Sequence, residues 1–319
     1  MLVKIKYFIS VCAILFAAAM LPVKAQFETV DNYVKSLGKL DTLNAGSISY
    51  LLTNKFSEPK EKVRAIFTWI AFNIDFDCKL GKNGSDEKMT SEEVLRKRKT
   101  IANGYAALFQ DMCSVAKIRC LTVDGYAKRR TEEIGEKPDA MNHTWAVVQL
   151  GQSPDSWHYV DPTWGSGYTD EKMTIYTRSF NPDYFFADRT IFNYQHFPDN
   201  SAWLLGAGTK SIKDFFQQPV VKDVAFRWNL KGYSPQNGFI KTKVGASVEF
   251  SIRVQGSENI EIVALEVGTE KKRRKKTVDY KLKDGNIFFS FKFEEEDSYP
   301  VYVLINNQAV LGYQVEVAE

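Results

Sequence analysis

The sequence predicts an α+β fold in which helices precede an antiparallel run of strands, followed by a second, all-β unit. Apolar residues recur at helical spacing as far as about residue 117, and then alternate with polar residues in 121–127, 144–150 and 157–160. From residue 220 onward, alternating segments follow one another closely. Helices followed by strands are typical of α+β proteins or of separate domains.

The expected helices lie within residues 26 to about 75, 91–98 and 100–117. In 61–74 the apolar residues share one helical face, and in 100–117 a second apolar stripe consists of Ile101, Tyr105, Leu108, Met112 and Val115. Ser91, followed by Glu92 and Glu93, predicts a helix start because a hydroxyl cap and early acidic residues favour a helix N-terminus. The Gly- and Asn-containing segment 79–88 is predicted to be a polar loop.

The first unit continues through three strands into an irregular region. Residues 151–156 are predicted to form the hairpin turn between the second and third strands. Residues 168–215 are rich in aromatic side chains and lack a clear period, so we expect them to wrap around the core.

The second unit is predicted to be an immunoglobulin-like β-sandwich over residues 220–319. Its seven expected strands are 224–230, 248–254, 260–267, 278–282, 287–293, 301–305 and 310–317. Asp284-Gly285 and Asn306-Asn307 are predicted hairpin turns. Gln217-Gln218-Pro219 has the composition of a linker, so we expect proteolysis there to release two folded fragments. The second unit contains no Cys and no His, and we expect it to act as a spacer or interaction module.

The N-terminus predicts export. Lys4 and Lys6 precede an apolar run over 7–21, and Val23-Lys24-Ala25 supplies the small residues that a signal peptidase recognises. Cleavage after Ala25 is expected, leaving a first domain over 26–216. A membrane anchor is the alternative, but the run is shorter than the roughly 20 residues that a membrane helix needs. We expect the mature chain to have no membrane span and to lie in the periplasm, at the cell surface or in the medium.

Charge and cysteine content narrow the function further. The formal net charge is +3, and the predicted leader carries three lysines and no acid, so the mature chain is close to neutral. Net charge therefore gives no support for a nucleic-acid partner. Cys78, Cys113 and Cys120 remain after processing, and an odd number leaves one thiol unpaired or available for intermolecular pairing.

Three segments carry the residues expected for chemistry: Ile101-Ala102-Asn103-Gly104-Tyr105, Asn142-His143-Thr144-Trp145 and Asp161-Pro162-Thr163-Trp164. Along the chain they give first a helix N-terminus, then a strand that bears a His, and then a neighbouring strand that bears an Asp. In acyl transfer by cysteine, a helix N-terminus and an imidazolium stabilise the thiolate, and a carboxylate orients the imidazole.

Together these segments resemble the bacterial transglutaminase-like domains, which have a papain-type core. The resemblance runs from about Glu61 to Trp203 and includes Thr122–Lys128, Asp183–Phe186 and His196–Trp203. It implies that His143 is the catalytic imidazole and Asp161 its orienting carboxylate. Asn103, Tyr105, Trp145 and Trp164 are carried over as binding residues, although aromatic side chains such as Tyr105, Trp145 and Trp164 are more often core residues than site residues. The resemblance implies no cofactor and no metal.

The position of the family's nucleophilic cysteine is occupied by Ala102, which cannot attack a carbonyl. Cys113 lies eleven residues further along the same predicted helix, about 16 Å away at 1.5 Å per residue. Cys120 lies at the wrong end of that helix, and Thr100 is a poor nucleophile unless a base reaches it. Cys78 precedes a predicted loop and is the remaining candidate for a relocated thiol.

These observations predict an exported pseudoenzyme that binds a peptide, a glycopeptide or a protein partner without covalent acyl transfer. The alternative is an active amidase, peptidase or acyltransferase that uses a relocated thiol or a water activated by His143 and Asp161. A third possibility is that Ala102 is an engineered replacement in an ordinary enzyme. His143 and Asp161 could also persist as a buried hydrogen-bonded pair without a binding role.

Three further features have weaker functional interpretations. The basic run 271–276 is expected to be a solvated hairpin tip balanced by the acidic residues 294–297, rather than an anion or membrane contact. His158 lacks metal-ligand spacing to His143, so no zinc site is expected there. Lys117 stands where related proteins often have Gly, so the turn after the helix is expected to differ.

Overall fold

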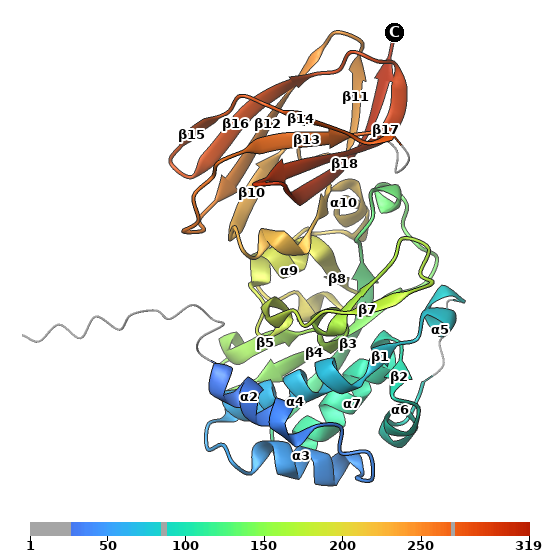
Figure 1. Ribbon diagram of the computed structural model, residues 1–319, viewed down its shortest axis with the longest axis vertical. Coiled ribbons are helices and arrows are strands. Elements are labelled where there is room, and N and C mark those ends of the chain that lie inside the picture. The colour runs from blue at the N-terminus through green and yellow to red at the C-terminus, as the bar shows by residue number, and fades with distance from the viewer. Residues whose placement is uncertain (1–26, 84–87, 269–271) are drawn as a thin grey trace, which may run out of the picture.

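The computed structural model describes residues 27–83, 88–268 and 272–319. The chain forms a mixed helix-and-sheet unit and a C-terminal unit of two packed β-sheets (Figure 1). The predicted α+β fold, with a sandwich-like C-terminal part, is confirmed. The predicted leader, residues 1–25, lies outside the described residues. Among the described residues, no helix combines the length and the apolar character that a membrane span requires.

Helices make up the first part of the chain. They are α2 (Glu28–Leu37), α3 (Ala45–Thr53), α4 (Pro59–Asn73), α5 (Cys78–Lys82), α6 (Ser91–Lys97) and α7 (Ala102–Val115). The cap of α6 is Thr90 rather than Ser91: the Thr90 hydroxyl accepts from the Glu93 N–H, and the Glu93 carboxylate accepts from the Thr90 N–H. After α7, Lys117 keeps a left-handed conformation with φ 60°, so the turn that favours Gly is retained with Lys.

A four-stranded antiparallel sheet in the order β5–β4–β3–β8 packs on α7. Its strands are β3 (Arg119–Ala127), β4 (His143–Gln149), β5 (Trp157–Val160) and β8 (His196–Pro198). The first three agree with the predicted strands. The fourth lies within the region that was expected only to wrap the core, and it pairs with the end of β3, where Ala127 lies opposite His196.

The remaining elements of this unit include short helices and strands that follow β5 along the chain. They are α8 (Pro162–Ser166), β6 (Gly167–Thr169), β7 (Tyr176–Arg178), α9 (Arg189–Gln195) and α10 (Ile212–Gln217). A two-stranded parallel pair, β1 (Asp75–Phe76) with β2 (Lys99–Thr100), fixes the chain just before α7. In Figure 1, α9 and α10 lie between the helical layer and the C-terminal sheets.

The C-terminal unit is formed by β9 (Val220–Val221), β10 (Leu230–Ser234), β11 (Phe239–Lys243), β12 (Ser247–Val254), β13 (Val263–Val267), β14 (Arg274–Thr277), β15 (Lys281–Lys283), β16 (Asn286–Lys292), β17 (Asp297–Ile305) and β18 (Gln308–Ala318). One sheet has the order β10–β12–β16–β15. The other has the order β11–β18–β17–β13–β14, with β9 also paired to β18. Side chains from both sheets, such as Phe289 and Val303, share one buried core.

The hairpin turns at Asp284-Gly285 and Asn306-Asn307 are confirmed, because all four residues have positive φ between paired strands. The predicted strand 224–230 is wrong. A 3₁₀ turn, Asp223–Ala225, occupies its start and the strand begins only at Leu230. The predicted strand 278–282 is also displaced, since the strands lie at 274–277 and 281–283.

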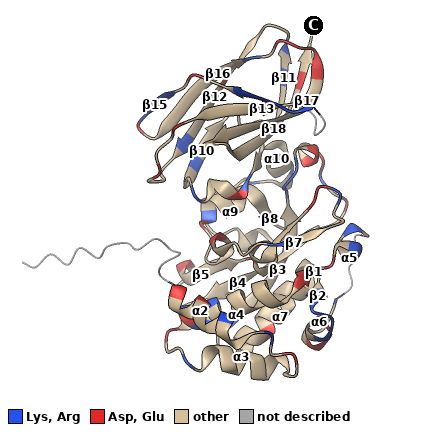
Figure 2. Cartoon of the chain, in the orientation of Figure 1, with Lys and Arg blue, Asp and Glu red and all other residues tan. Residues whose placement is uncertain are grey.

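In the described part of the basic run, Lys272 and Arg273 lie in the connection between the paired strands β13 and β14, and 274–276 continue into β14, an exposed edge strand. Arg274 contacts Glu295 at 2.8 Å and Lys276 contacts Glu294 at 3.4 Å. The acidic segment therefore does balance the basic one, as expected. Figure 2 shows basic and acidic residues interspersed over this unit.

The junction between the units is packed. Pro219 is buried, and the buried Lys128 donates from Nζ to the carbonyl oxygens of Phe215 (2.7 Å) and Gln218 (2.5 Å). Residue pairing between β9 and β18 begins directly afterwards. The segment 217–219 is thus held on both sides, which differs from the open linker that its composition indicates.

We therefore expect chymotrypsin to cleave slowly near Phe215 in the wild type. Lys128→Met should accelerate this cleavage by roughly tenfold, because a hydrogen-bonded charged donor contributes about 1.5–3 kcal/mol and cleavage follows the open population. The experiment belongs at pH 6, since burial lowers the pKa of Lys128 to about 7. Lys213→Met on the exposed side of α10 is the matched control. Equal cleavage of the wild type and Lys128→Met would contradict this account.

Candidate functional site

The N-terminus of α7 is set by the short β1–β2 pair. Thr100 in β2 lies opposite Phe76 in β1, and the extended Ile101 then leads into Ala102, the first residue of α7. A side chain at Gly104 would collide with the Thr100 side chain, so the helix can begin this close to β2 only with Gly at that position. This local packing accounts for the Gly in the Ala102-Asn103-Gly104 motif.

His143 and Asp161 come together because their strands are neighbours in the sheet. His143 is the first residue of β4 and Asp161 follows the last residue of β5. Asn142 fixes the start of β4, since its side-chain amide accepts from the N–H of Ala127 (2.8 Å) and donates to its carbonyl oxygen (3.0 Å). The His143 Nε2 then lies 2.7 Å from the Asp161 Oδ2. The predicted pair is present as a hydrogen-bonded contact.

The carboxylate of Asp161 is fully buried and accepts on both oxygens. Oδ1 accepts from the backbone N–H groups of Thr163 and Trp164, each at 2.9 Å, as the N-cap of α8. Burial by itself raises the pKa of Asp161, but the nearby histidines outweigh it and hold that pKa well below its ordinary value. Asp161 is therefore a fixed, ionised acceptor for the imidazole.

A second histidine completes this cluster. The Nε2 of His196, in β8, lies 3.1 Å from the same Asp161 Oδ2. Its ring is fully buried and stacks on Phe192 at 3.8 Å, and burial lowers the pKa of His196 to about 4. His196 is within the motif His196–Trp203, but no role was predicted for it. Its only sequence signal is that it is one of three histidines in the chain.

His143, Asp161 and His196 offer three potential ligand atoms that lie within 4.8 Å of one another. Within the part of the chain that the structure describes, these three side chains form the group that could hold a metal ion. Each nitrogen instead lies at hydrogen-bond distance from one carboxylate oxygen. Hydrogen bonding thus accounts for the contacts of the cluster. The interpretation without a metal stays a prediction.

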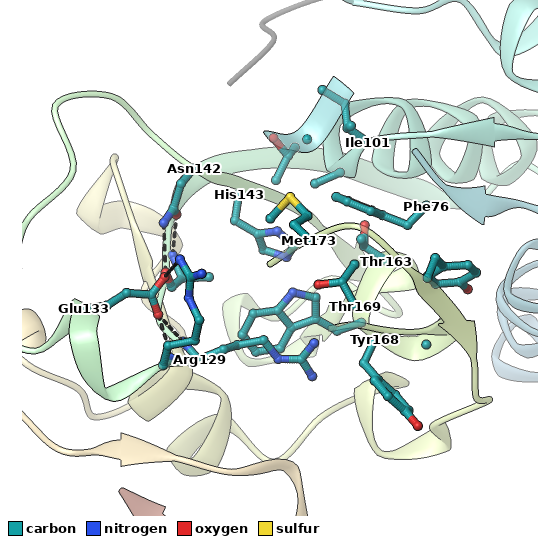
Figure 3. Close-up of a pocket in the computed structure, with 18 of the residues that line it drawn as sticks. Phe76, Ile101, Arg129, Glu133, Asn142, His143, Thr163, Tyr168, Thr169 and Met173 are labelled. Atoms are coloured by element: carbon teal, nitrogen blue, oxygen red, sulfur yellow. Dashed lines mark hydrogen bonds and ion pairs between the residues drawn. The ribbon is translucent and has the colours of Figure 1, made fainter. Parts of the chain in front are cut away.

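The open side of His143 faces a cavity of about 1200 Å³, which we call the groove (Figure 3). Ala102 and Asn103 at the start of α7, together with His143 and Trp164, line it. Because Nε2 of His143 faces Asp161, its Nδ1 is the nitrogen left to take or give a proton in the groove. The other lining residues include the apolar side chains of Phe76, Ile101, Met141, Tyr168 and Met173 and the charged side chains of Arg129, Arg130, Glu133, Asp170, Glu171, Lys222 and Asp223.

Two of the predicted binding residues lie beneath the groove. Tyr105 and Trp145 are fully buried and are not among the groove-lining residues. The Tyr105 hydroxyl donates to the Ile74 carbonyl oxygen at 2.9 Å, and the Trp145 ring packs against His196 at 5.2 Å. They support the site from the core, whereas Asn103 and Trp164 line the groove.

None of the possible substitute nucleophiles lines the groove. Cys113 and Cys120 are buried in the core, and the buried Thr100 hydroxyl donates to the Met89 sulfur at 3.4 Å. Cys78 is partly buried at the start of α5, where burial, followed by Asp170 and Asp77, raises the pKa of its thiol. A raised pKa is the wrong direction for a nucleophilic thiolate.

His158 stacks on Phe186 at 4.3 Å, apart from the cluster.

Residues 47–162 match the model of the transglutaminase-like superfamily, a region that contains Ala102, His143 and Asp161. This part of the chain is a transglutaminase-like domain. Kyphoscoliosis peptidase is 32% identical to this chain over 220 residues in Mus musculus and 33% identical over 224 residues in Homo sapiens. Each alignment covers 69% of this chain, but only 32% and 33% of the respective relatives, so the chain spans about a third of their length.

These two relatives are animal proteins, so the bacterial origin implied by the resemblance stays a prediction. A solved structure, a putative protease from Parabacteroides distasonis, aligns with 91% of this chain and 53% of its own chain at 11% identity. Its TM-score is 0.29, which is too low to support any argument. The placement of the transglutaminase-like domain therefore depends on the sequence match and on the site geometry.

Proposed function

We propose that this protein is an exported pseudoenzyme whose transglutaminase-like groove binds a peptide, a glycopeptide or a protein segment without forming an acyl-enzyme. One observation carries the proposal: Ala102 and His143 line the same groove, while none of the described cysteines does. The base and its orienting carboxylate are in place, but the position that needs a thiol has a methyl group.

The chemical character of the groove supports a peptide-like ligand. Its lining contains both apolar and charged side chains, and both are needed to bind a chain with mixed side chains and polar amides. The relatives are called peptidases, which agrees with a groove for a polypeptide substrate. The export and the partner class are proposals that depend on the leader and on this groove.

The alternative is an active enzyme. A relocated Cys78 has little support, because this thiol does not line the groove and its pKa is raised. A water molecule activated by His143 is compatible with the geometry, since His143 lines the groove and its contact with Asp161 uses only Nε2. An engineered Ala102 is compatible too, and the codon of the natural gene at this position decides that point.

Activity assays separate these possibilities. The mature wild type should incorporate no fluorescent amine into dimethylcasein and release no peptide from labelled casein above the level of a His143→Ala variant. Ligand binding is measured with fluorescein-labelled octapeptides by polarisation. For octapeptides that bind, Ala102→Phe should weaken binding at least tenfold, by filling the groove beside His143.

Val115→Phe, at the exposed C-terminal end of the same helix, is the matched control and should leave binding unchanged. Amine incorporation or peptide release that His143→Ala abolishes would refute the pseudoenzyme. Octapeptide binding that is indifferent to Ala102→Phe would refute the groove as the binding site.

A further inference from the structure

The C-terminal unit supplies part of the groove. Val220 and Val221 of β9 pair with Gly312 and Leu311 of β18, so this segment belongs to a sandwich sheet. The residues that follow it, Lys222, Asp223 and Val224, line the groove, as does Ala309. The second unit is therefore placed to contact whatever the groove holds, which a passive spacer would not do.

Asp223 joins this segment to the first unit through two side-chain hydrogen bonds. Its Oδ2 accepts from Arg129 Nη2 at 2.7 Å, and its Oδ1 accepts from the Tyr184 hydroxyl at 2.7 Å. Burial raises the pKa of Asp223, but Arg129 and the hydrogen bonds prevail and keep it below its ordinary value. An ionised Asp223 thus ties both side chains to the C-terminal unit.

Arg129 connects Asp223 to the site. Its guanidinium carbon lies 3.9 Å from the centre of the Trp164 ring, and Trp164 in turn packs on His143 at 5.2 Å. The backbone of Arg129 is held as well, since its N–H donates to Glu133 and its carbonyl oxygen accepts from Lys222 Nζ, both at 2.7 Å. Figure 3 shows Arg129 and His143 extending into one cavity.

The guanidinium of Arg129 has donors left for a ligand. Within the residues that the structure describes, its hydrogen bond is the one from Nη2 to Asp223, and its side chain is 31% exposed where it lines the groove. A guanidinium has five N–H donors in a fixed plane. The remaining donors are therefore available to an acceptor oxygen beside Trp164.

We propose that Arg129, positioned by Asp223 from the C-terminal unit, is a specificity-determining residue that binds an acyl oxygen of the peptide ligand beside His143. This inference depends on the proposed function, because it assigns a residue of the same groove. The oxygen belongs either to a carboxylate of the ligand or to a main-chain carbonyl. Both present the same acceptor chemistry to an arginine.

The test compares Arg129→Gln and Asp223→Asn with the wild type on labelled octapeptides, each made as a C-terminal acid and as a C-terminal amide. Arg129→Gln should weaken binding about tenfold or more, and Asp223→Asn should weaken it in the same direction because Arg129 is no longer held. A loss confined to the acid form assigns a terminal carboxylate, and an equal loss in both forms assigns another carboxylate or a main-chain carbonyl. Lys231→Gln removes a different inter-unit ion pair, to Asp188 at 3.0 Å, outside the groove, and should have no effect.

A measurement without ligand tests the positioning role. The indole N–H resonance of Trp164 should shift in Arg129→Gln and in Asp223→Asn, and should stay in place in Lys231→Gln. Unchanged binding in Arg129→Gln overturns the proposal, while sensitivity to Ala102→Phe would still uphold the proposed function. Tighter binding in Asp223→Asn, or an unmoved Trp164 resonance, overturns the positioning by Asp223. Failure of every octapeptide to bind the wild type overturns both.

Discussion

Ala102→Cys should create a thiol that reacts with iodoacetamide at pH 6 roughly 10 to 100 times faster than an ordinary cysteine. The new thiol would stand at the first residue of the 14-residue helix α7, in the groove that His143 also lines. The helix N-terminus and an imidazolium both stabilise a thiolate, so its pKa should lie well below the ordinary value near 8.5. Alkylation rates measured by mass spectrometry from pH 5 to 8 test this.

The experiment is best done in a Cys78→Ser background, which removes the partly buried native thiol. The two remaining native cysteines, Cys113 and Cys120, are buried. Adding His143→Ala should return the rate toward that of an ordinary thiol, since the imidazole is then absent. Adding His158→Ala should not, because His158 lies apart from the cluster. A rate at the ordinary value in the Ala102→Cys variant, or one indifferent to His143, would mean that α7 and His143 do not form the expected thiolate site.

The parts of the site that could be predicted from sequence are those fixed by local pattern. The start of α7 follows from its apolar stripe and the Gly104 that lets it approach β2, and His143 and Asp161 follow from the motifs at the ends of two regular strands. Their meeting required only that β4 and β5 be neighbours, which a hairpin ensures.

His196, Arg129 and Asp223 could not be predicted in this way. His196 reaches Asp161 across 35 residues through a three-residue strand, which is too short to have a clear alternation of its own. Arg129 and Asp223 are 94 residues apart and belong to different units. Sequence spacing carries no information on such pairs, because they depend on how one sheet packs on another unit.

The same limit explains the errors in the C-terminal unit. Apolar and polar residues alternate only in 226–230, and at Asp223–Ala225 a helical turn forms, where Asp223 is hydrogen-bonded to Arg129 and Tyr184. Long-range contacts thus override a local β pattern. The strand that does form, β10, contains Gly232 and ends next to Pro235, so its sequence has a weak strand signal.

The free energy of unfolding should fall as the pH decreases from about 6.5 to 4, and His196 should account for about 3 kcal/mol of this loss. Burial lowers the pKa of His196 from 6.5 to about 4 in the folded chain. Between these two values the unfolded chain binds a proton that the folded chain does not. The stability is therefore fully present above pH 6.5 and decreases by about 1.4 kcal/mol per pH unit below it. Urea unfolding at pH 4.5, 5.5 and 7 measures the slope.

His196→Gln removes the titrating ring, so its unfolding free energy should change much less between pH 7 and 4.5 than that of the wild type. His158→Gln is the control: His158 is only partly buried, and its pKa is lowered by burial and by nearby cations, so removing it should flatten the slope less. Asp161 affects the free energy of unfolding in a different pH range. Because its pKa is lowered in the folded state, its contribution is present above about pH 4 and is lost only below that value. If the pH dependence of the unfolding free energy between pH 7 and 4.5 is the same in His196→Gln as in the wild type, then His196 is not held neutral beside Asp161 in the folded chain.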